Sequence, residues 1–288
     1  MAVVRRVLIV ALALEVVLTA APQPARIISL IPAVTEMLFA IGAGPEVVGV
    51  SSFDRFPSEV SSRQKVGGLL DPDTERIVAL RPTLVVICET QFELRDRLAT
   101  AGIHTWPYRH GSVASIYDTI RGLGHALGRT TESEALTIRM QRQIADVRTA
   151  LNQTPPTRTL FVIGRDIDAL QHLSVAGGEG FLNEIIELAG GINVFRDVAR
   201  PVVDASHEQV LARRPEAILE LWVNRRLDAT ASRREIAVWN TLPGLPAVRN
   251  HRILEINDER LTIPGPRLPD GARLFASLLH RARDSRAV

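Results

Sequence analysis

Aromatic and arginine side chains recur in the loops that follow the predicted strands of this 288-residue chain. The aromatic residues are Phe53, Tyr108 and Trp222, and the basic residues are Arg165, Arg225 and Arg260. An aromatic ring stacks on the flat face of a ligand, and a guanidinium group binds carboxylate or phosphate with a fixed fork of donors. The combination predicts a non-covalent site for a large, partly flat ligand with anionic or amide groups. Asp54 and Glu89 lie in the same loops and are included in this predicted site.

These loops are positioned by short strand-like runs that alternate with helical runs. RIISL is typical of a strand, the stretch from Pro32 to Ile41 of a helix, and EVVGVSS of a second strand. A helix from Thr74 to Leu80 is ended by Arg81-Pro82, because proline cannot continue a helix, and a buried strand follows. FELRDRLATAG and IHTWPY add another helix and another strand.

A second α/β series begins at TLFVIG and continues through FLNEIIELAGG, HRILEI and a closing helix from Asp270 to about Arg283. Strands separated by helices predict mainly parallel sheets that are covered by helices on both faces. In such sheets the ligand-binding loops follow the carboxyl ends of the strands.

One long helix is predicted between the two series. Apolar residues recur there at steps of three or four, and they are Leu136, Met140, Ile144, Val147 and Leu151. Thr131 and Glu134 form a predicted capping box at its start. The predicted organisation is a signal peptide (1–21), an N-terminal α/β lobe (22–129), a linking helix (130–153) and a C-terminal α/β lobe (154–288).

The composition excludes several function classes. The formal charge is +2, and acidic residues are spread among the basic ones, so no basic stripe for nucleic acid is present. Lys65 is the only lysine and Val66 follows it, which excludes a phosphate-binding P-loop.

The first 21 residues combine two arginines, an apolar run and small residues, as in a secretory signal peptide, so we expect a periplasmic or other extracytoplasmic location.

Two stretches of the sequence repeat one another. TERIVALRPTLVVI begins at Thr74 and HEQVLARRPEAILE at His207, and at a constant offset four residue pairs are identical. These pairs are Glu75/Glu208, Ala79/Ala212, Arg81/Arg214 and Pro82/Pro215. Helix-Arg-Pro-strand units occur in many α/β proteins, so the repeat by itself leaves open whether it reflects function.

The order of motifs resembles the periplasmic binding proteins for cobalamin and iron chelates. RIISLIPAVTEMLFAIGAGPEVVGVSSFDRFP and VGGLLDPDTERIVALRPTLVV are similar to their N-terminal lobe, and GFLNEIIELAGGINVF and SHEQVLARRPEAIL to their C-terminal lobe. The resemblance covers roughly residues 26–280 and implies two lobes joined by one long helix, with the ligand in the cleft between them. It also implies that Glu75 and Glu208 dock on arginines of a dimeric ABC importer permease.

A single glutamate at a helix start is better explained by stabilisation from the helix dipole. The matched pair in matching lobes favours docking. The protein is expected to act as a monomer.

The identity of the ligand stays open at this point. Cobalamin binders of this family tend to carry tryptophan near the positions of Leu69 and Cys88, and both tryptophans are absent here. We favour a cobalamin-type ligand, include Leu69 in the predicted site, and keep a ferric siderophore or haem as the alternative. The tyrosine and histidines available to a haem iron are Tyr108, His110 and His172.

Bare metal binding and catalysis are less well supported. The seven histidines form no Cys/His pair or histidine-rich loop, so neither a protein metal site nor a resident cofactor is expected. An exported enzyme that uses Cys88 with His104 or His110 is the alternative from another class. A single cysteine next to VVI is more often buried and inert, and we expect no enzymatic activity.

Overall fold

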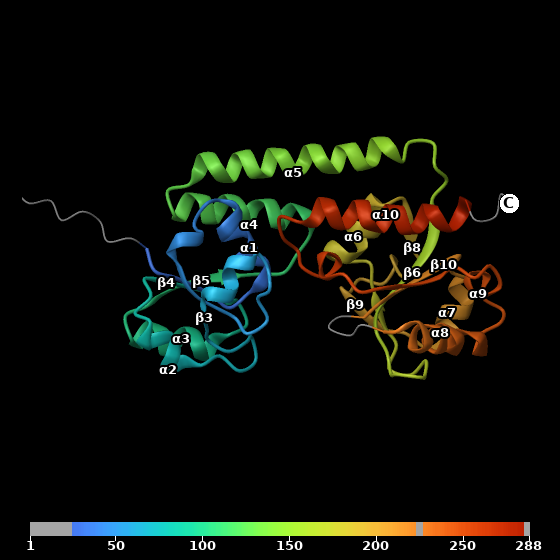
Figure 1. Ribbon diagram of the computed structural model, residues 1–288, viewed down its shortest axis with the longest axis horizontal. Helices are drawn as coiled ribbons and strands as arrows, with labels where there is room; N and C mark the ends of the chain where they lie inside the picture. The colour runs from blue at the N-terminus through green and yellow to red at the C-terminus, as the bar shows by residue number, and fades with distance from the viewer. Residues whose placement is uncertain (1–24, 223–226, 285–288) are drawn as a thin grey trace, which may run out of the picture.

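The computed structural model describes residues 25–222 and 227–284, which form two α/β lobes side by side with a long helix above both (Figure 1). The predicted signal peptide and Arg225 lie outside these residues. Within them, no helix has the length and apolar character required to cross a bilayer.

The first lobe contains a five-stranded parallel sheet in the order β3-β2-β1-β4-β5. Its strands are β1 (Ile27–Ser29), β2 (Val47–Val50), β3 (Gln64–Lys65), β4 (Leu84–Cys88) and β5 (His104–Tyr108). The helices α1 (Pro32–Ala40), α2 (Thr74–Ala79) and α3 (Phe92–Thr100) connect them, together with short 3-10 turns at Gly44–Glu46 and Ser58–Ser62. The central strands are apolar and buried, as expected of strands covered on both faces.

The second lobe contains a six-stranded mixed sheet. Its strands are β6 (Thr157–Gly164), β7 (Ser174–Ala176), β8 (Gly191–Asn193), β9 (Val202–Asp204), β10 (Ala217–Leu221) and β11 (Ile253–Ile256). β8, β6, β10 and β11 run parallel, while β7 pairs antiparallel with β6 and β9. Its helices are α6 (Phe181–Leu188), α7 (His207–Arg213), α8 (Ala229–Val238), α9 (Pro246–Arg249) and α10 (Leu268–Asp284). The predicted fold class is confirmed.

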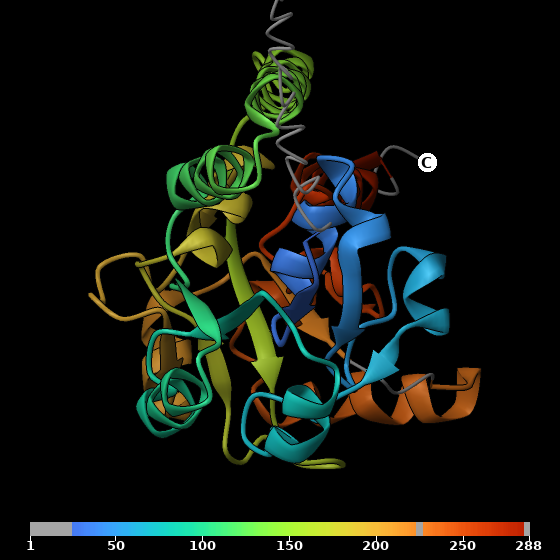
Figure 2. The same ribbon diagram turned by 90° about the vertical axis from the view of Figure 1, so that its left-hand side faces the viewer.

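Two antiparallel helices carry the chain from the first sheet to the second. They are α4 (Val113–Ala126), which the sequence patterns did not predict, and α5 (Thr130–Ala150), a single 21-residue helix as predicted. Viewed along the long axis of the molecule, α5 lies above α4 and α10, with the sheets below (Figure 2). The predicted capping box is wrong. Arg129 is the N-cap without a side-chain cap, and Glu134 instead pairs with Arg121 at 3.1 Å.

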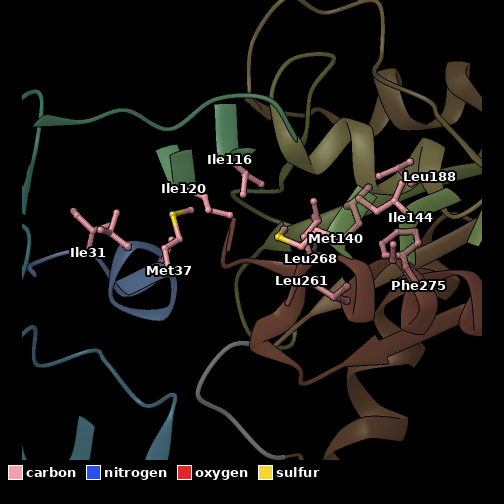
Figure 3. Close-up of a cluster of buried hydrophobic side chains, with 14 of the residues drawn as sticks. Ile31, Met37, Ile116, Ile120, Met140, Ile144, Leu188, Leu261, Leu268 and Phe275 are labelled. Carbon is pink, nitrogen blue, oxygen red and sulfur yellow. The ribbon is translucent and has the colours of Figure 1, made fainter. Parts of the chain in front are cut away.

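One apolar cluster extends through both lobes. It joins Ile31 and Met37 of the first lobe to Met140 of α5 and to Leu188 and Phe275 of the second lobe (Figure 3). Because these buried side chains contact one another without interruption, the lobes share a core where α4, α5, α6 and α10 meet. Two smaller clusters, one in each lobe, cover the remaining sheet faces.

The sequence repeat is also a structural repeat. α2 leads through Arg-Pro into β4, which pairs with β1, and α7 leads through Arg-Pro into β10, which pairs with β6. Arg26 beside β1 donates to the Leu80 carbonyl at 2.8 Å, and Arg158 in β6 donates to the Arg213 carbonyl at 2.5 Å. In both lobes an arginine at the first parallel strand therefore satisfies a carbonyl at the helix C-terminus, where a positive charge is favourable.

Candidate functional site

The two repeated glutamates occupy equivalent exposed positions. Glu75 is the second residue of α2, whose N-cap Asp73 accepts a hydrogen bond from the Arg76 N–H at 2.9 Å. Glu208 is the second residue of α7, which Ser206 begins with a capping box. Because Asp73 and Ser206 already cap the two helices, neither glutamate serves as the N-cap residue. Both carboxylates face solvent at the same place in their repeats.

Exposed apolar side chains gather in the loops after β2 and β3. Phe53 is 61 % exposed, and its ring packs on Gly68, where a Cβ would lie 2.6 Å from Phe53 Cε2. Leu69 and its neighbour Leu70 follow, and Leu70 is 95 % exposed. The Ser52 N–H donates to the Gly67 carbonyl at 2.8 Å and joins the two loops. The structure thus brings the predicted residues Phe53 and Leu69 into one apolar surface.

A hollow of about 510 Å³ lies beside this surface and beside the start of α2. Leu69, Leu70, Thr74, Gln91 and Phe92 are among its lining residues. A second hollow of about 500 Å³ lies between α4, α5 and α6, away from the loops that follow the parallel strands.

Asp54 is buried in the loop that carries Phe53. Its Oδ2 accepts the Ser51 N–H at 2.8 Å, and Lys65 Nζ donates to the Asp54 backbone carbonyl at 2.9 Å. Burial raises the pKa of the Asp54 carboxyl above its ordinary value, and hydrogen bonds from Ser51 and Thr35 oppose this shift. The carboxylate therefore holds the loop together and does not present its charge at the surface.

The loops after β4 and β5 contact each other through side chains. Glu89 binds Arg109 at 2.8 Å, so its charge is already paired. Tyr108 is buried, and its hydroxyl lies 3.4 Å from His110 Nδ1, with the two rings edge to face. Burial also raises the pKa of the Tyr108 hydroxyl. His172 lies in the other lobe, where its Nδ1 is 2.9 Å from Asp166.

Arg165 belongs to the interior of the second lobe. Its guanidinium binds Glu220 at 2.6 Å and Glu235 at 2.9 Å, and its side chain is 1 % exposed. Trp239 Nε1 donates to the same Glu220 carboxylate at 2.8 Å. The prediction that Arg165 offers its charge to a ligand is therefore not supported. Two buried carboxylates require this guanidinium as their counter-charge.

Trp222 lies next to this buried network at the end of β10. The Arg165 guanidinium lies 5.0 Å from the centre of its ring, and both residues line a cavity of about 210 Å³. Arg260 follows β11 and pairs with Asp258 at 2.5 Å, with part of its side chain open to solvent. Of the residues of the C-terminal lobe that were predicted to bind the ligand, Trp222 and Arg260 lie in the loops where the ligand was expected.

A polar contact between the lobes was missed by the sequence patterns. Arg267 of the second lobe donates to both carboxylate oxygens of Glu36 in α1, and its guanidinium lies 4.2 Å from the centre of the Phe56 ring. The available signal was Glu36 itself, the charged residue in the mainly apolar helix stretch PAVTEMLFA.

The side chains that could bind a metal ion or act as a nucleophile were located in the described residues. Residues 25–222 and 227–284 contain no group of three histidine, cysteine or acidic side chains able to hold a metal ion. Cys88 is buried, and its sulfur accepts a hydrogen bond from the Thr90 hydroxyl at 3.3 Å. This setting is typical of a structural cysteine.

The chain belongs to the periplasmic binding protein family, whose profile matches residues 27–259. It is 26 % identical over 253 residues to a vitamin B12-binding protein of Vibrio parahaemolyticus, covering 87 % of this chain and 88 % of that one. It is also 25 % identical to YvrC, an ABC transporter substrate-binding lipoprotein of Bacillus subtilis, over 90 % of this chain and 81 % of that one.

Solved structures show the same fold. The periplasmic haem-binding protein RhuT of Roseiflexus aligns with a TM-score of 0.74 and 28 % identity, over 90 % of this chain and 98 % of that one. The vitamin B12-binding protein BtuF of Vibrio cholerae aligns with a TM-score of 0.74 and 24 % identity, over the same shares.

Proposed function

We propose that this protein captures a metal chelate, with cobalamin favoured, between its two lobes outside the cytoplasm and delivers it to the permease of an ABC importer. The observation that carries the proposal is the exposed apolar surface of Phe53 and Leu69 at the carboxyl ends of parallel strands, in a chain of this family. Trp222 and Arg260 are the proposed contacts from the second lobe. The proposed division into lobes is 22–129 and 154–288, with α5 as the linking element.

Haem or a ferric siderophore is the second candidate ligand. Tyr108 and His110 lie together at the end of β5, and a haem-binding protein is among the structural relatives. Tyrosine and histidine are both known axial ligands of haem iron. The burial of Tyr108 means that its loop must move before its oxygen can reach an iron.

A panel of purified chelates tests the proposal. A ligand at 100 times its dissociation constant stabilises the folded state by about 2.7 kcal/mol, which is visible as a rise in melting temperature. We expect cyanocobalamin to raise the melting temperature more than haemin or ferric siderophores. A rise with haemin alone selects the second candidate, and no rise with any member contradicts chelate capture.

Export and docking are parts of the same proposal. We propose that residues 1–21 are removed on export, which N-terminal sequencing of the protein from its native cells tests. Glu75 and Glu208 are the proposed docking residues, one for each half of a dimeric permease.

An exported enzyme would instead turn over a substrate with Cys88, and loss of hydrolysis of small esters in a Cys88→Ala variant would favour that function.

A further inference from the structure

Glu36 is a buried acidic residue inside an apolar helix. It is 3 % exposed, and its neighbours Val34, Met37 and Leu38 in α1 are fully buried. Desolvation raises the pKa of the Glu36 carboxyl, and the guanidinium of Arg267 acts in the opposite direction. A buried carboxylate without a counter-charge is strongly unfavourable, so the ionised form of Glu36 depends on that partner.

The counter-charge comes from the other lobe. Arg267 lies just before α10, and its Nε donates to Glu36 Oε2 at 2.9 Å while its Nη2 donates to Oε1. The same Nη2 donates to Glu259 Oε1 at 2.9 Å. A bidentate arginine-carboxylate pair fixes both the distance and the relative orientation of its partners. This pair therefore fixes α1 relative to the start of α10.

Arg267 also contacts the loops of the proposed ligand site. Its guanidinium lies over the ring of Phe56, 4.2 Å from the ring centre, and Phe56 belongs to the same loop as Phe53. Glu259 precedes Arg260 in the loop that follows β11. One side chain thus joins α1, the loop of Phe53 and the loop of Arg260.

We propose that Arg267 is a positioning residue that sets the separation of the two lobes and holds the loops of Phe53 and Arg260 ready for the ligand. The burial of apolar area in the cluster between the lobes is non-directional, so it does not by itself specify one relative orientation of the lobes. The bidentate pair loses hydrogen bonds under the same movement. The effect on ligand affinity rests on the proposed capture, whereas the effect on lobe separation does not.

The first measurement is the distance between the lobes of the full chain without ligand. Spin labels on Arg95→Cys in α3 and Arg249→Cys in α9, both exposed positions, report this distance by pulsed electron resonance, in a Cys88→Ala background. We expect Arg267→Met to lengthen and broaden the distance distribution. Arg273→Met is the matched control, because Arg273 lies on α10 and pairs with Asp270 of the same helix at the surface. A second label pair within the first lobe, at Ser61 and Arg95, should not change.

The second measurement is the affinity for cyanocobalamin and haemin by titration. We expect Arg267→Met and Glu36→Gln to weaken binding about tenfold or more, Arg267→Lys to weaken it less, and Arg273→Met to leave it unchanged. If Arg267→Met does not fold, the Lys and Gln variants carry both measurements.

The two measurements separate failure of this inference from failure of the proposed function. Distance distributions that match the unchanged protein in every folded variant overturn the positioning role. Absence of binding by the unchanged protein contradicts chelate capture, and the distances still decide the role of Arg267.

Discussion

Arg81 and Arg214 adopt the same left-handed backbone conformation, with φ angles of 45° and 49°. Each stands between a helix and a proline, and the right-handed helical conformation is disfavoured for a residue before proline. The left-handed conformation ends the helix in one residue but costs a residue other than glycine about 1–2 kcal/mol. Both lobes therefore use the same strained link to turn from α2 into β4 and from α7 into β10.

Replacing one of these arginines by glycine should relieve the strain. We expect Arg214→Gly to raise the free energy of unfolding by up to about 1 kcal/mol, since the greater freedom of glycine in the unfolded chain cancels part of the gain. Urea denaturation measures the change. Ala212→Gly, two residues earlier within α7, is the control and should lower stability by about 0.5–1 kcal/mol. Equal losses of stability in the Arg214→Gly and Ala212→Gly variants would contradict the inference that the backbone of Arg214 is strained.

The buried network around Arg165 should be a major contributor to stability. We expect Arg165→Met to lower the free energy of unfolding by about 3–5 kcal/mol, because Glu220 and Glu235 are left buried without a counter-charge. Adding Glu220→Gln and Glu235→Gln should recover part of the loss. Denaturant titration of the single and triple variants measures both effects. A single variant as stable as the unchanged protein would show that the carboxylates find another partner.

Asp54 should make stability depend on pH. Burial raises the pKa of its carboxyl in the folded state, so its contribution is fully present below its ordinary pKa of about 3.9 and is lost as the pH rises through the folded value. An asparagine at this position would not ionise and so would lack this loss, while its side-chain oxygen could still accept the Ser51 N–H. We therefore expect Asp54→Asn to become more stable relative to the unchanged protein as the pH rises from about 4 to about 7. Thermal melts of both proteins across this range measure the difference in their stability. A stability difference that does not vary with pH would contradict the raised pKa of the Asp54 carboxyl.

Charge reversal at the repeated glutamates tests docking. We expect the Glu75→Arg, Glu208→Arg double variant to lose most uptake in cells with the cognate permease, since loss of an interfacial charge pair costs about 2–5 kcal/mol when it is buried on docking. Ligand affinity and melting temperature should stay nearly unchanged, because both side chains are exposed. Glu132→Arg, at the exposed start of α5, is the matched control. Normal uptake by the double variant rules out docking through these residues.

Local patterns in the sequence were sufficient for the longer parallel strands, for α5 and for the positions of Glu75 and Glu208, whereas the short parallel strands β3 and β8 were not predicted. These features depend on periodicity and on helix start and stop signals within a few residues. Side-chain partners were not predictable in this way. Arg165 was assigned to the ligand, but its partners Glu220 and Glu235 come from distant elements, and Glu36 and Arg267 are separated by 231 positions. An aromatic or charged residue in a loop indicates a site, whereas its burial is decided by the tertiary fold.

The apolar cluster shared by both lobes has a consequence for how the chain unfolds. Residues from α1, α4, α5, α6 and α10 complete one another's packing, so loss of either half exposes apolar surface on the other. Cooperativity arises when elements depend on common buried contacts in this way. We expect calorimetry to show a single transition, and neither half expressed alone to reach the stability that it has in the intact chain. In its architecture the protein has two lobes, but we expect them to unfold as one unit.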